Sequence, residues 1–381
     1  MRILFSSTPA HGHLLPQLPL ARAFRDRGDD VAVLTAASYA SLVAAERFEL
    51  LAAGPEMPVL LAESLRRTGA DAATEPTPEA VAELFAGVRI DLSADEAVAA
   101  ARGFRPDLIV SEATDFVGPF VAAALDVPLA KLALGPHLPD EFSEVFDSVA
   151  EARHKKHGLA VPTPLWHLDP CPQLLQTPGW QQPQGWTPLR PEAHRGPDTP
   201  EHVGTAAPGA APAAGSRPKA LLSFGTHFAQ PEVLRPLVKA LAPTVDVLAT
   251  LALTATDENV GSDLDHVEVT RFAPLAELLD GIAVVVTHGG AGTTLGTLAR
   301  GLPLVVVPQG ADQFLQAAAV TSSGTGIAVL PPANDPEMVA KAVAEVLGNP
   351  EYRDNALRAA AQIAAMPSPR EIADRLADEL S

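Results

Sequence analysis

A histidine followed by glycines stands in the C-terminal half of the chain, and these residue types could bind phosphate. The stretch consists of His288, Gly289, Gly290, Ala291, Gly292, Thr293 and Thr294. Glycines let backbone amides come close to a ligand, and a following helix directs its unpaired N–H groups and its positive dipole end at the loop. The imidazole and the two hydroxyls can donate to phosphate oxygens. The stretch therefore predicts a site for a phosphorylated ligand.

The elements that position this stretch are expected to be a strand, a helix and a second strand. Residues 284–287 are a β-branched apolar run, short enough for a buried parallel strand. The helix should begin at Thr293 and end at Gly301, because Pro303 just beyond it cannot continue a helix. Residues 304–307 then form the next buried strand. Parallel strands deliver the residues that follow them to one carboxyl edge, where open α/β sheets bind ligands.

Two further polar residues, Asp312 and Gln313, follow the second of these strands. They would lie at the same edge of the sheet, and a carboxylate with an amide is suited to hydrogen-bonding sugar hydroxyls. The alternative is an ordinary strand-to-helix turn with a solvated Asp-Gln pair. Because His288 precedes the glycines and the Asp-Gln pair ends the next unit, the ligand-binding interpretation is favoured.

The N-terminus shows the same order of elements. The pattern predicts a strand, a loop, an amphipathic helix and a second strand at residues 2–7, 8–16, 17–27 and 31–35. The crossover of such a unit is right-handed, which puts the loop with His11 and His13 at the carboxyl edge of the sheet. The loop is not a dinucleotide-binding fingerprint, because it lacks Gly-x-Gly-x-x-Gly and no acidic residue ends the second strand.

The rest of the first half contains further helices and strands around one irregular region. Helices are expected at 59–67, 78–85 and 117–125, and strands at 106–112, ending in Glu112, and at 129–134. Residues 135–186 are interpreted as irregular and apolar, with Phe142, Phe146, Trp166, Trp180 and Trp186. An apolar pocket for a small molecule and simple packing of a loop on the core explain these aromatics equally well.

Length and charge narrow the classes of function. A chain of 381 residues suggests two domains, and 47% hydrophobic residues are enough for two sizeable cores. The formal net charge of −19 repels nucleic acid and anionic membranes, so neither is an expected partner. An acidic protein that binds a phosphorylated ligand must therefore do so with local donors.

The chain is expected to act in the cytoplasm. It contains one cysteine, Cys171, so neither a disulfide framework nor a cysteine-based metal site can form within it. The first residues predict a strand rather than a signal peptide, and no apolar run is long enough to cross a membrane.

Three segments together resemble a known signature. They are His288-Gly-Gly-Ala-Gly-Thr-Thr, Gly301-Leu-Pro and Pro308-Gln-Gly-Ala-Asp-Gln. This order is similar to the donor signature of family-1 glycosyltransferases of the GT-B fold, and especially of actinobacterial enzymes that glycosylate macrolides, aromatic polyketides and enediynes. The resemblance covers essentially the whole chain and implies an α/β protein of two Rossmann-like, doubly wound domains that face each other across a cleft.

The resemblance also implies a domain plan. The boundaries expected are 1–204 for an acceptor-binding domain, 205–218 for a linker, 219–366 for a nucleotide-sugar-binding domain and 367–381 for a C-terminal helix that crosses back to the first domain. The linker is rich in proline, glycine and alanine, which marks the boundary independently of the resemblance.

The N-terminal loop resembles the Gly-His-x-x-Pro element of the same family, in which the histidine is the general base. That role falls on His13, and a neutral imidazole near pH 7 is suited to it. The family usually has Asp at the position of Glu112, where the carboxylate orients the base. His11 and Asp115 remain alternatives for the two roles.

The resemblance implies a set of donor-binding residues in the second half. Thr226, in Phe224-Gly225-Thr226-His227, matches a second phosphate-contacting loop, and Phe272 and Ala273 match the positions that stack on and pair with the nucleotide base. Gln316 stands where the family usually has Asn near the phosphates. The complete set is Thr226, Phe272, Ala273, His288, Gly290, Gly292, Thr293, Asp312, Gln313 and Gln316.

The expected function is that of an inverting, metal-independent hexosyltransferase of antibiotic biosynthesis. It would need no cofactor and would move a (deoxy)sugar from a dTDP-sugar or UDP-sugar, its co-substrate, to a hydroxyl of a hydrophobic natural-product aglycone. A homodimer is possible. The alternatives are a C-glycosyltransferase of the same family, a nucleotide-sugar 2-epimerase on the same fold, and a non-catalytic auxiliary partner of a glycosyltransferase.

Overall fold

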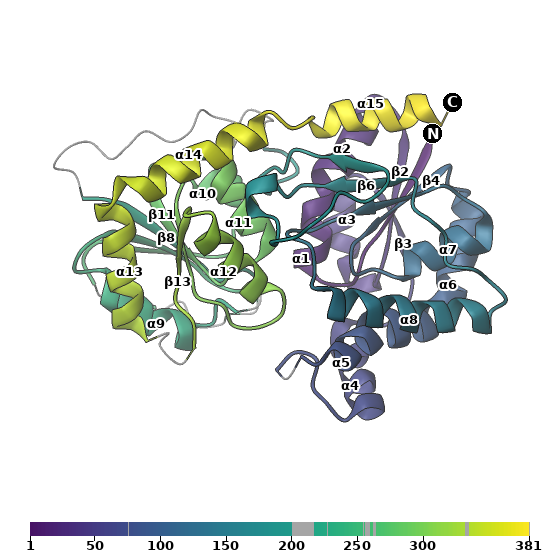
Figure 1. Cartoon of the computed structure of the whole chain (residues 1–381), viewed down its shortest axis with the longest axis horizontal. Helices are drawn as coiled ribbons and strands as arrows, with labels where there is room; N and C mark the ends of the chain where they lie inside the picture. The colour runs from purple at the N-terminus through teal and green to yellow at the C-terminus, as the bar shows by residue number, and fades with distance from the viewer. Residues whose placement is uncertain are drawn as a thin grey trace. The chain divides into compact units, whose positions relative to one another are not determined.

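The chain divides into two compact units (Figure 1). The computed structural model describes residues 1–74, 76–199, 217–226, 228–253, 255, 260–261, 264–331 and 335–380. The first unit comprises Met1–Pro170, Gly179–Leu189 and Pro367–Ser381, and the second comprises Cys171–Pro178 and Arg190–Met366. Residues 205–216 of the predicted linker lie outside the described residues. The division differs from the predicted boundary at residue 204, because two segments before it belong to the second unit.

The first unit is built on a parallel sheet of seven strands in the order β3-β2-β1-β4-β5-β6-β7. Its strands are β1 (Arg2–Ser6), β2 (Asp30–Thr35), β3 (Glu49–Ala52), β4 (Leu108–Glu112), β5 (Leu129–Leu132), β6 (Trp166–Asp169) and β7 (Trp186–Pro188). Chain order reverses between β1 and β4, so the ends of these two strands lie next to each other at the switch point of the sheet.

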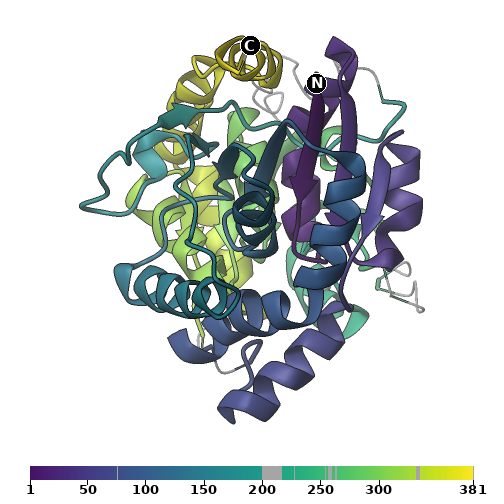
Figure 2. The same ribbon diagram turned by 90° about the vertical axis from the view of Figure 1, so that its right-hand side faces the viewer.

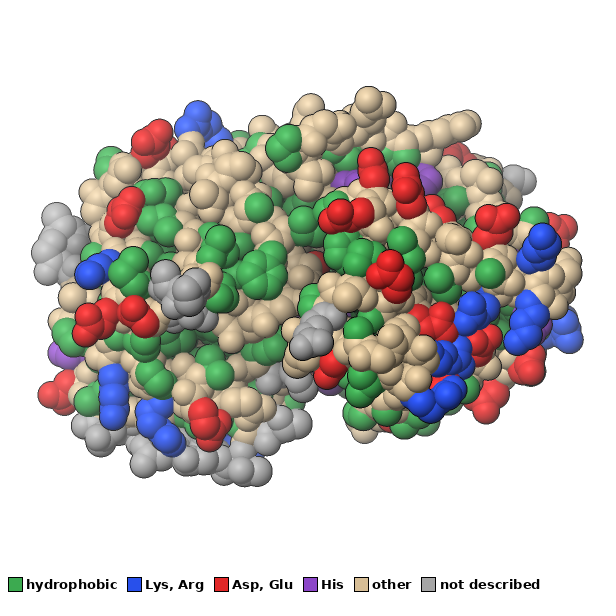
Figure 3. All heavy atoms as spheres, turned by 60° about the horizontal axis from the view of Figure 1, so that its bottom comes forward, with side chains coloured by type: hydrophobic (Ala, Val, Ile, Leu, Met, Phe, Trp, Pro, Cys, Tyr) green, Lys and Arg blue, Asp and Glu red, His purple; other side chains and the backbone are tan. Residues whose placement is uncertain are grey.

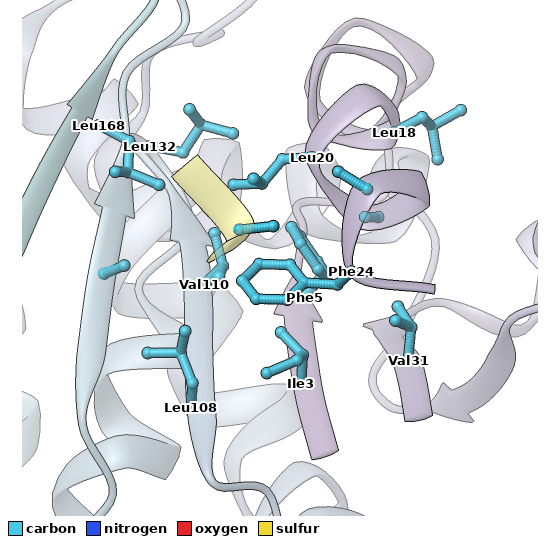
Figure 4. Close-up of a cluster of buried hydrophobic side chains, with 14 of the residues drawn as sticks. Ile3, Phe5, Leu18, Leu20, Phe24, Val31, Leu108, Val110, Leu132 and Leu168 are labelled. Atoms are coloured by element: carbon cyan, nitrogen blue, oxygen red, sulfur yellow. The ribbon is translucent and has the colours of Figure 1, made fainter. Parts of the chain in front are cut away.

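Helices complete the first unit, some packed on the sheet and others packed on neighbouring helices. They are α1 (His11–Leu14), η1 (Leu15–Gln17), α2 (Leu18–Arg27), η2 (Ala37–Tyr39), α3 (Ala40–Ala45), α4 (Met57–Thr68), α5 (Pro78–Ala82), η3 (Glu83–Val88), α6 (Arg89–Phe104), α7 (Val117–Leu125), α8 (Asp140–Lys156) and α15 (Pro369–Glu379). Side chains alternate between faces along a strand. Phe5 of β1 therefore points toward Phe24 of α2, at a ring-centroid distance of 6.2 Å (Figure 4), while Leu4 belongs to the cluster on the opposite face.

Three sequence-based predictions for this unit are wrong in detail. The segment 135–186 is not all irregular, because α8 occupies Asp140–Lys156. The helical content of 55–98 is also larger than predicted, since α5 continues through η3 into α6. The loop predicted at 8–16 contains the short helix α1, so both His11 and His13 lie on a helical turn rather than in extended chain.

The C-terminal helix α15 packs within the first unit. Ile372, Ala373 and Leu376 lie in the same buried cluster as Phe24, and the Nε1 of Trp166 donates to the Oε2 of Glu379 at 2.6 Å. A capping box of Ser368 and Glu371 fixes the start of the helix. The two ends of the chain consequently lie close together (Figures 1 and 2).

The second unit contains a parallel sheet of six strands in the order β10-β9-β8-β11-β12-β13. The strands are β8 (Lys219–Ser223), β9 (Asp246–Thr250), β10 (Val267–Thr270), β11 (Ile282–Thr287), β12 (Leu304–Val306) and β13 (Gly326–Ala328). The helices are η4 (Gln173–Leu175), α9 (Pro231–Leu241), α10 (Leu275–Leu278), α11 (Ala291–Ala299), α12 (Gln313–Ser322), α13 (Pro336–Gly348) and α14 (Pro350–Ala364). The predicted α/β architecture with doubly wound sheets is confirmed in both units.

In the described part of the chain, no helix is both long enough and apolar enough to cross a bilayer.

Candidate active site

His13 and Glu112 meet at the switch point of the first sheet. His13 lies on α1, directly after β1, and Glu112 is the last residue of the neighbouring strand β4. The Nδ1 of His13 lies 3.1 Å from the Oε1 of Glu112. The chain thus brings together two residues that are 99 positions apart, as the predicted carboxyl-edge placement requires.

Glu112 is completely buried and is held as an anion. Burial alone would raise the pKa of Glu112, but the His13 imidazole and hydrogen bonds, among them one from the backbone of Thr114, lower it to about 2. The backbone N–H of Thr114 donates to Oε2 at 2.7 Å, and that of Thr8 donates to Oε1 at 3.3 Å. A carboxylate in this setting can stabilise an imidazolium beside it.

Thr114 is a third member of this group that the sequence analysis missed. Its Oγ1 lies 3.0 Å from the Nδ1 of His13 and donates to the Oε2 of Glu112 at 2.9 Å. With Nδ1 directed at these oxygens, Nε2 is the basic nitrogen of the neutral imidazole. The side chain of His13 is 21% exposed, so a ligand can reach the ring. The arrangement can accept a proton from a hydroxyl and stabilise the charge that results.

The two alternatives for these roles have other contacts. Asp115 is buried, accepts from the backbone N–H of Gly118 at 2.9 Å at the start of α7, and lies 3.5 Å from the guanidinium of Arg89. The imidazole of His11 packs against Tyr39, with ring centroids 5.1 Å apart, and burial lowers the pKa of His11. The geometry therefore favours Glu112 over Asp115 as the partner of His13.

A lysine close to this group also escaped the sequence analysis. The Nζ of Lys131 donates to the carbonyl of Ala113 at 2.9 Å and lies 4.6 Å from the centre of the Phe116 ring. Burial lowers the pKa of Lys131, although the nearby Glu112 opposes this effect. In the sequence, Lys131 could have been noticed as the single charged residue of an otherwise apolar strand.

In the second unit, the predicted donor-binding residues follow the carboxyl ends of four strands. Thr226 follows β8, and the half-buried Phe272 and Ala273 follow β10. His288 and the glycines follow β11, and Asp312 and Gln313 follow β12. One edge of one sheet therefore presents these residues.

The imidazole of His288 occupies a slot lined by two glycines. A Cβ on Gly225 would lie 2.8 Å from its Cε1, and a Cβ on Gly290 would lie 2.8 Å from its Nε2. Phe224 and Phe228 pack on the ring with centroid distances of 6.1 and 5.7 Å. This burial lowers the pKa of His288 to about 4, against a smaller opposing effect of a hydrogen bond with the backbone of Ser223. His288 is therefore neutral at pH 7.

This shift predicts an acid-dependent loss of stability. Between pH 6.5 and pH 4 the unfolded chain binds a proton at His288 that the folded chain does not bind, so the unfolded state is favoured as the pH falls. The free energy of unfolding should drop across this window by up to about 3 kcal/mol more in the wild type than in His288→Gln. Urea denaturation of both proteins at several pH values measures this. Identical pH dependence in the two proteins would contradict the buried, neutral state.

The glycine-rich loop leads into α11 two residues earlier than predicted. Gly290 precedes the helix, which begins at Ala291 rather than Thr293. Gly292 is exposed and Thr293 half-buried, so both stand on the open side of the first turn. Thr294 is completely buried, which removes it from the hydroxyls that could meet a phosphate. The first turn keeps its unpaired N–H groups as an anion site.

The two polar residues after β12, Asp312 and Gln313, differ in their burial and contacts. Asp312 is exposed, while Gln313 is buried and its Oε1 accepts from the backbone N–H groups of Gln309 and Gly310 at 2.7 and 3.1 Å. The oxygen of Gln313 therefore shapes the loop. Gln316 is buried on α12, and its Oε1 has no hydrogen-bond partner among the described residues.

The described residues contain no group of three or more His, Cys, Asp or Glu side chains placed to hold a metal ion. An Asp-x-Asp triplet occurs at 263–265. Asp265 lies just before β10, at the amino end of that strand, whereas the donor candidates follow carboxyl ends.

Comparison with known domain families identifies the chain. Residues 22–179 match the family described as "Erythromycin biosynthesis protein CIII-like, N-terminal domain", and residues 238–379 match the corresponding C-terminal domain. The chain belongs to this glycosyltransferase family. The enzyme is accordingly a family-1 glycosyltransferase of the actinobacterial natural-product type, as the resemblance implied.

Individual relatives and solved structures agree. The glycosyltransferase is 30% identical to L-demethylnoviosyl transferase of Streptomyces niveus, over 100% of the chain and 98% of the relative. It is 26% identical to 3-alpha-mycarosylerythronolide B desosaminyl transferase of Saccharopolyspora erythraea, over 98% and 96%. The structure of the Streptomyces sp. SF2575 glycosyltransferase SsfS6 with thymidine diphosphate is 27% identical, with a TM-score of 0.81 and coverage of 100% and 99%. The fold is therefore GT-B.

Proposed function

We propose that this glycosyltransferase moves a (deoxy)sugar from a dTDP-sugar to a hydroxyl of a hydrophobic natural-product aglycone, with inversion at the anomeric carbon. The observation that carries the proposal is the hydrogen-bonded pair of His13 and Glu112, because a buried carboxylate beside a solvent-accessible imidazole is suited to general-base deprotonation of an acceptor. The thymidine diphosphate in the SsfS6 structure favours dTDP over UDP as the nucleotide.

The first unit supplies the base. The Nε2 of His13 takes the proton of the acceptor hydroxyl as its oxygen attacks the anomeric carbon from the face opposite the diphosphate. Glu112 and Thr114 hold Nδ1 protonated, and the anionic Glu112 stabilises the imidazolium that forms. Because one attack displaces the leaving group directly, the configuration inverts.

The second unit stabilises the leaving diphosphate. The anionic diphosphate favours protonation of His288, whose second N–H then donates to a phosphate oxygen while the first keeps its bond to the backbone of Ser223, and the amides at the start of α11 add donors and the positive end of the helix dipole. Thr226 and Thr293 are half-buried hydroxyls at the same edge. We assign Gly290 and Gly292 to close approach of the phosphates. These local donors explain how a chain with a net charge of −19 can bind an anionic nucleotide.

The remaining donor candidates recognise the base and the sugar. The ring of Phe272 stacks on thymine while the backbone of Ala273 pairs with its edge. Asp312 binds sugar hydroxyls together with the amide of Gln313. Gln316, which is buried on α12, supports the phosphate loop.

The competing functions fit less well. A 2-epimerase would leave the pair of His13 and Glu112 unexplained, and an auxiliary protein would not need to keep both this pair and the His288 slot. A C-glycosyltransferase would use the same base on a carbon nucleophile, so it is separated from an O-glycosyltransferase by the linkage of the product.

Calorimetry with dTDP and UDP tests the donor site. The wild type should bind dTDP more tightly than UDP, and His288→Ala should weaken dTDP binding about 10–100-fold, the range expected for loss of a hydrogen bond to a charged group. His266→Ala is the matched control, because His266 is 54% exposed and lies just before β10. Absence of binding to either nucleotide by the wild type would refute the proposal.

A further inference from the structure

A π-helical turn interrupts the helix that follows the N-terminal α4. Residues Pro78–Ala82, Glu83–Val88 and Arg89–Phe104 form one continuous helix, and the middle segment, η3, has π-helical geometry. Turns of this kind are rare in proteins, and those that occur are often found at functional sites. Contacts with two other helices hold this turn, and one of its side chains lies beside His13.

Ion pairs from two other helices hold the turn in place. The Oε1 of Glu83 accepts from Arg67 of α4 at 2.7 Å and from Arg153 of α8 at 2.8 Å. Asp91, two turns on, accepts from the same two arginines at 2.7 and 3.2 Å. Basic and acidic side chains lie close together on this part of the first unit, toward the right of Figure 3.

A glycine makes room for this arrangement. A Cβ on Gly87 would lie only 2.3 Å from the Oε2 of Glu83. Because residue 87 has no side chain, the carboxylate of Glu83 folds back over the turn and contacts both arginines. The turn, the glycine and the two arginines form one brace across α4, η3 and α8.

The side chain that this turn directs is Phe85. Its ring centroid lies 5.6 Å from that of His13, with 35° between the planes. On its other side the ring of Phe146 lies at 6.2 Å, and Phe146 stacks on Phe116 at 5.4 Å. Phe146 and Phe116 are buried, so they support Phe85 from behind.

We propose that Phe85 is a positioning residue for His13, fixed by the braced π-helical turn. This inference rests on the proposed role of His13 as the base. Hydrogen bonds to Glu112 and Thr114 act on the Nδ1 edge of the imidazole. The phenyl ring of Phe85 packs beside the imidazole ring itself, restrains its tilt and aims Nε2 at the acceptor hydroxyl. Misplacement of a catalytic group by about 1 Å can cost up to about 10²-fold in rate.

The direct test replaces Phe85 with leucine, which keeps an apolar side chain but removes the ring. We expect kcat to fall about tenfold, while the KM for the dTDP-sugar changes less than about twofold, because the donor site is in the other unit. Phe104→Leu is the matched control, since Phe104 is a half-buried phenylalanine of the same unit that packs against a different buried cluster. An unchanged kcat in Phe85→Leu, or an equal loss in both variants, would overturn the proposal.

An indirect variant tests the brace without touching either ring. Glu83→Gln weakens both ion pairs of the turn, and kcat should fall in the same direction by a smaller factor, with the folded state confirmed by circular dichroism. Full activity in Glu83→Gln together with a loss in Phe85→Leu would restrict the role to the ring and overturn the part assigned to the brace.

A readout that needs no substrate separates this inference from the proposed function. The Cε1 proton of His13, assigned by its absence in the NMR spectrum of His13→Ala, should shift when Phe85 becomes leucine and stay in place in Phe104→Leu. An unmoved signal would overturn the contact. If the signal moves but the wild type transfers no sugar to any acceptor, the proposed function fails while the ring contact stands.

Discussion

Replacing His13 with alanine is expected to lower kcat by about 10²–10⁴-fold, the usual contribution of a positioned general base. The alanine cannot take the proton of the acceptor hydroxyl, and Thr114, whose hydroxyl is also hydrogen-bonded to Glu112, is not a base near pH 7. Binding of dTDP should be unchanged, because the donor candidates belong to the second unit. Steady-state kinetics with a dTDP-sugar, together with dTDP calorimetry, measures both effects.

His11→Ala is the control for this prediction. His11 lies on the same short helix, two residues away, and its ring packs on Tyr39 instead of contacting Glu112. Its loss should leave kcat within about threefold of the wild type, the scale of a small structural effect. If His11→Ala were the inactive variant and His13→Ala were active, the assignment of the base would be reversed.

Replacing Glu112 with glutamine should lower kcat by about 10²-fold or more, because the imidazolium loses its counter-ion and the tautomer of His13 is no longer fixed. The amide has nearly the same shape as the carboxylate, so one oxygen can still accept from the backbone N–H of Thr114. The acidic limb of the pH profile of kcat/KM should move to lower pH, since protonated His13 is no longer stabilised by a negative charge. Kinetics across the pH range measures both changes.

Glu112→Asp separates charge from geometry. The aspartate restores the carboxylate that related enzymes usually carry, at the cost of a shorter reach to Nδ1. We expect its kcat to lie between those of the wild type and Glu112→Gln, with the acidic limb near its wild-type position. Equal activity of wild type and Glu112→Gln would mean that the carboxylate only supports the fold.

The sequence was sufficient for residues that sit at strand ends. The apolar runs before Glu112, His288 and Asp312 each predict a buried parallel strand, and parallel strands must deliver the next residues to one edge. His13 follows the first strand in the same way. Position along the chain therefore determines position at the sheet edge for these residues, without knowledge of tertiary contacts.

Other features depend on contacts that no local pattern contains. The aromatic residues after position 135 suggested an irregular apolar segment. The structure instead has the mainly polar helix α8 there, in which only Phe146, Ala150 and His154 are buried. The π-helical turn is held by Arg67 and Arg153 from two other helices. Its existence could not be inferred from residues 83–88 alone.

The division between the units has a similar cause. Cys171 and Leu175 precede the predicted linker, yet they pack in one buried cluster with Leu295 and Leu298 of α11. The linker composition marked a break in the chain, but tertiary packing decided which unit the preceding segment joined. Thr294 shows the same limit at the scale of one side chain, because the helix phase that buries it depends on where α11 begins.

The most direct test of this account is to follow a dTDP-sugar with and without a panel of hydroxylated polyketide aglycones. We expect dTDP release only with an acceptor, one glycoside formed for each dTDP, and an anomeric configuration opposite to that of the donor, read from NMR coupling constants. Retention of configuration, or conversion of the dTDP-sugar to an epimer without any glycoside, would contradict transfer by direct displacement with His13 as the base.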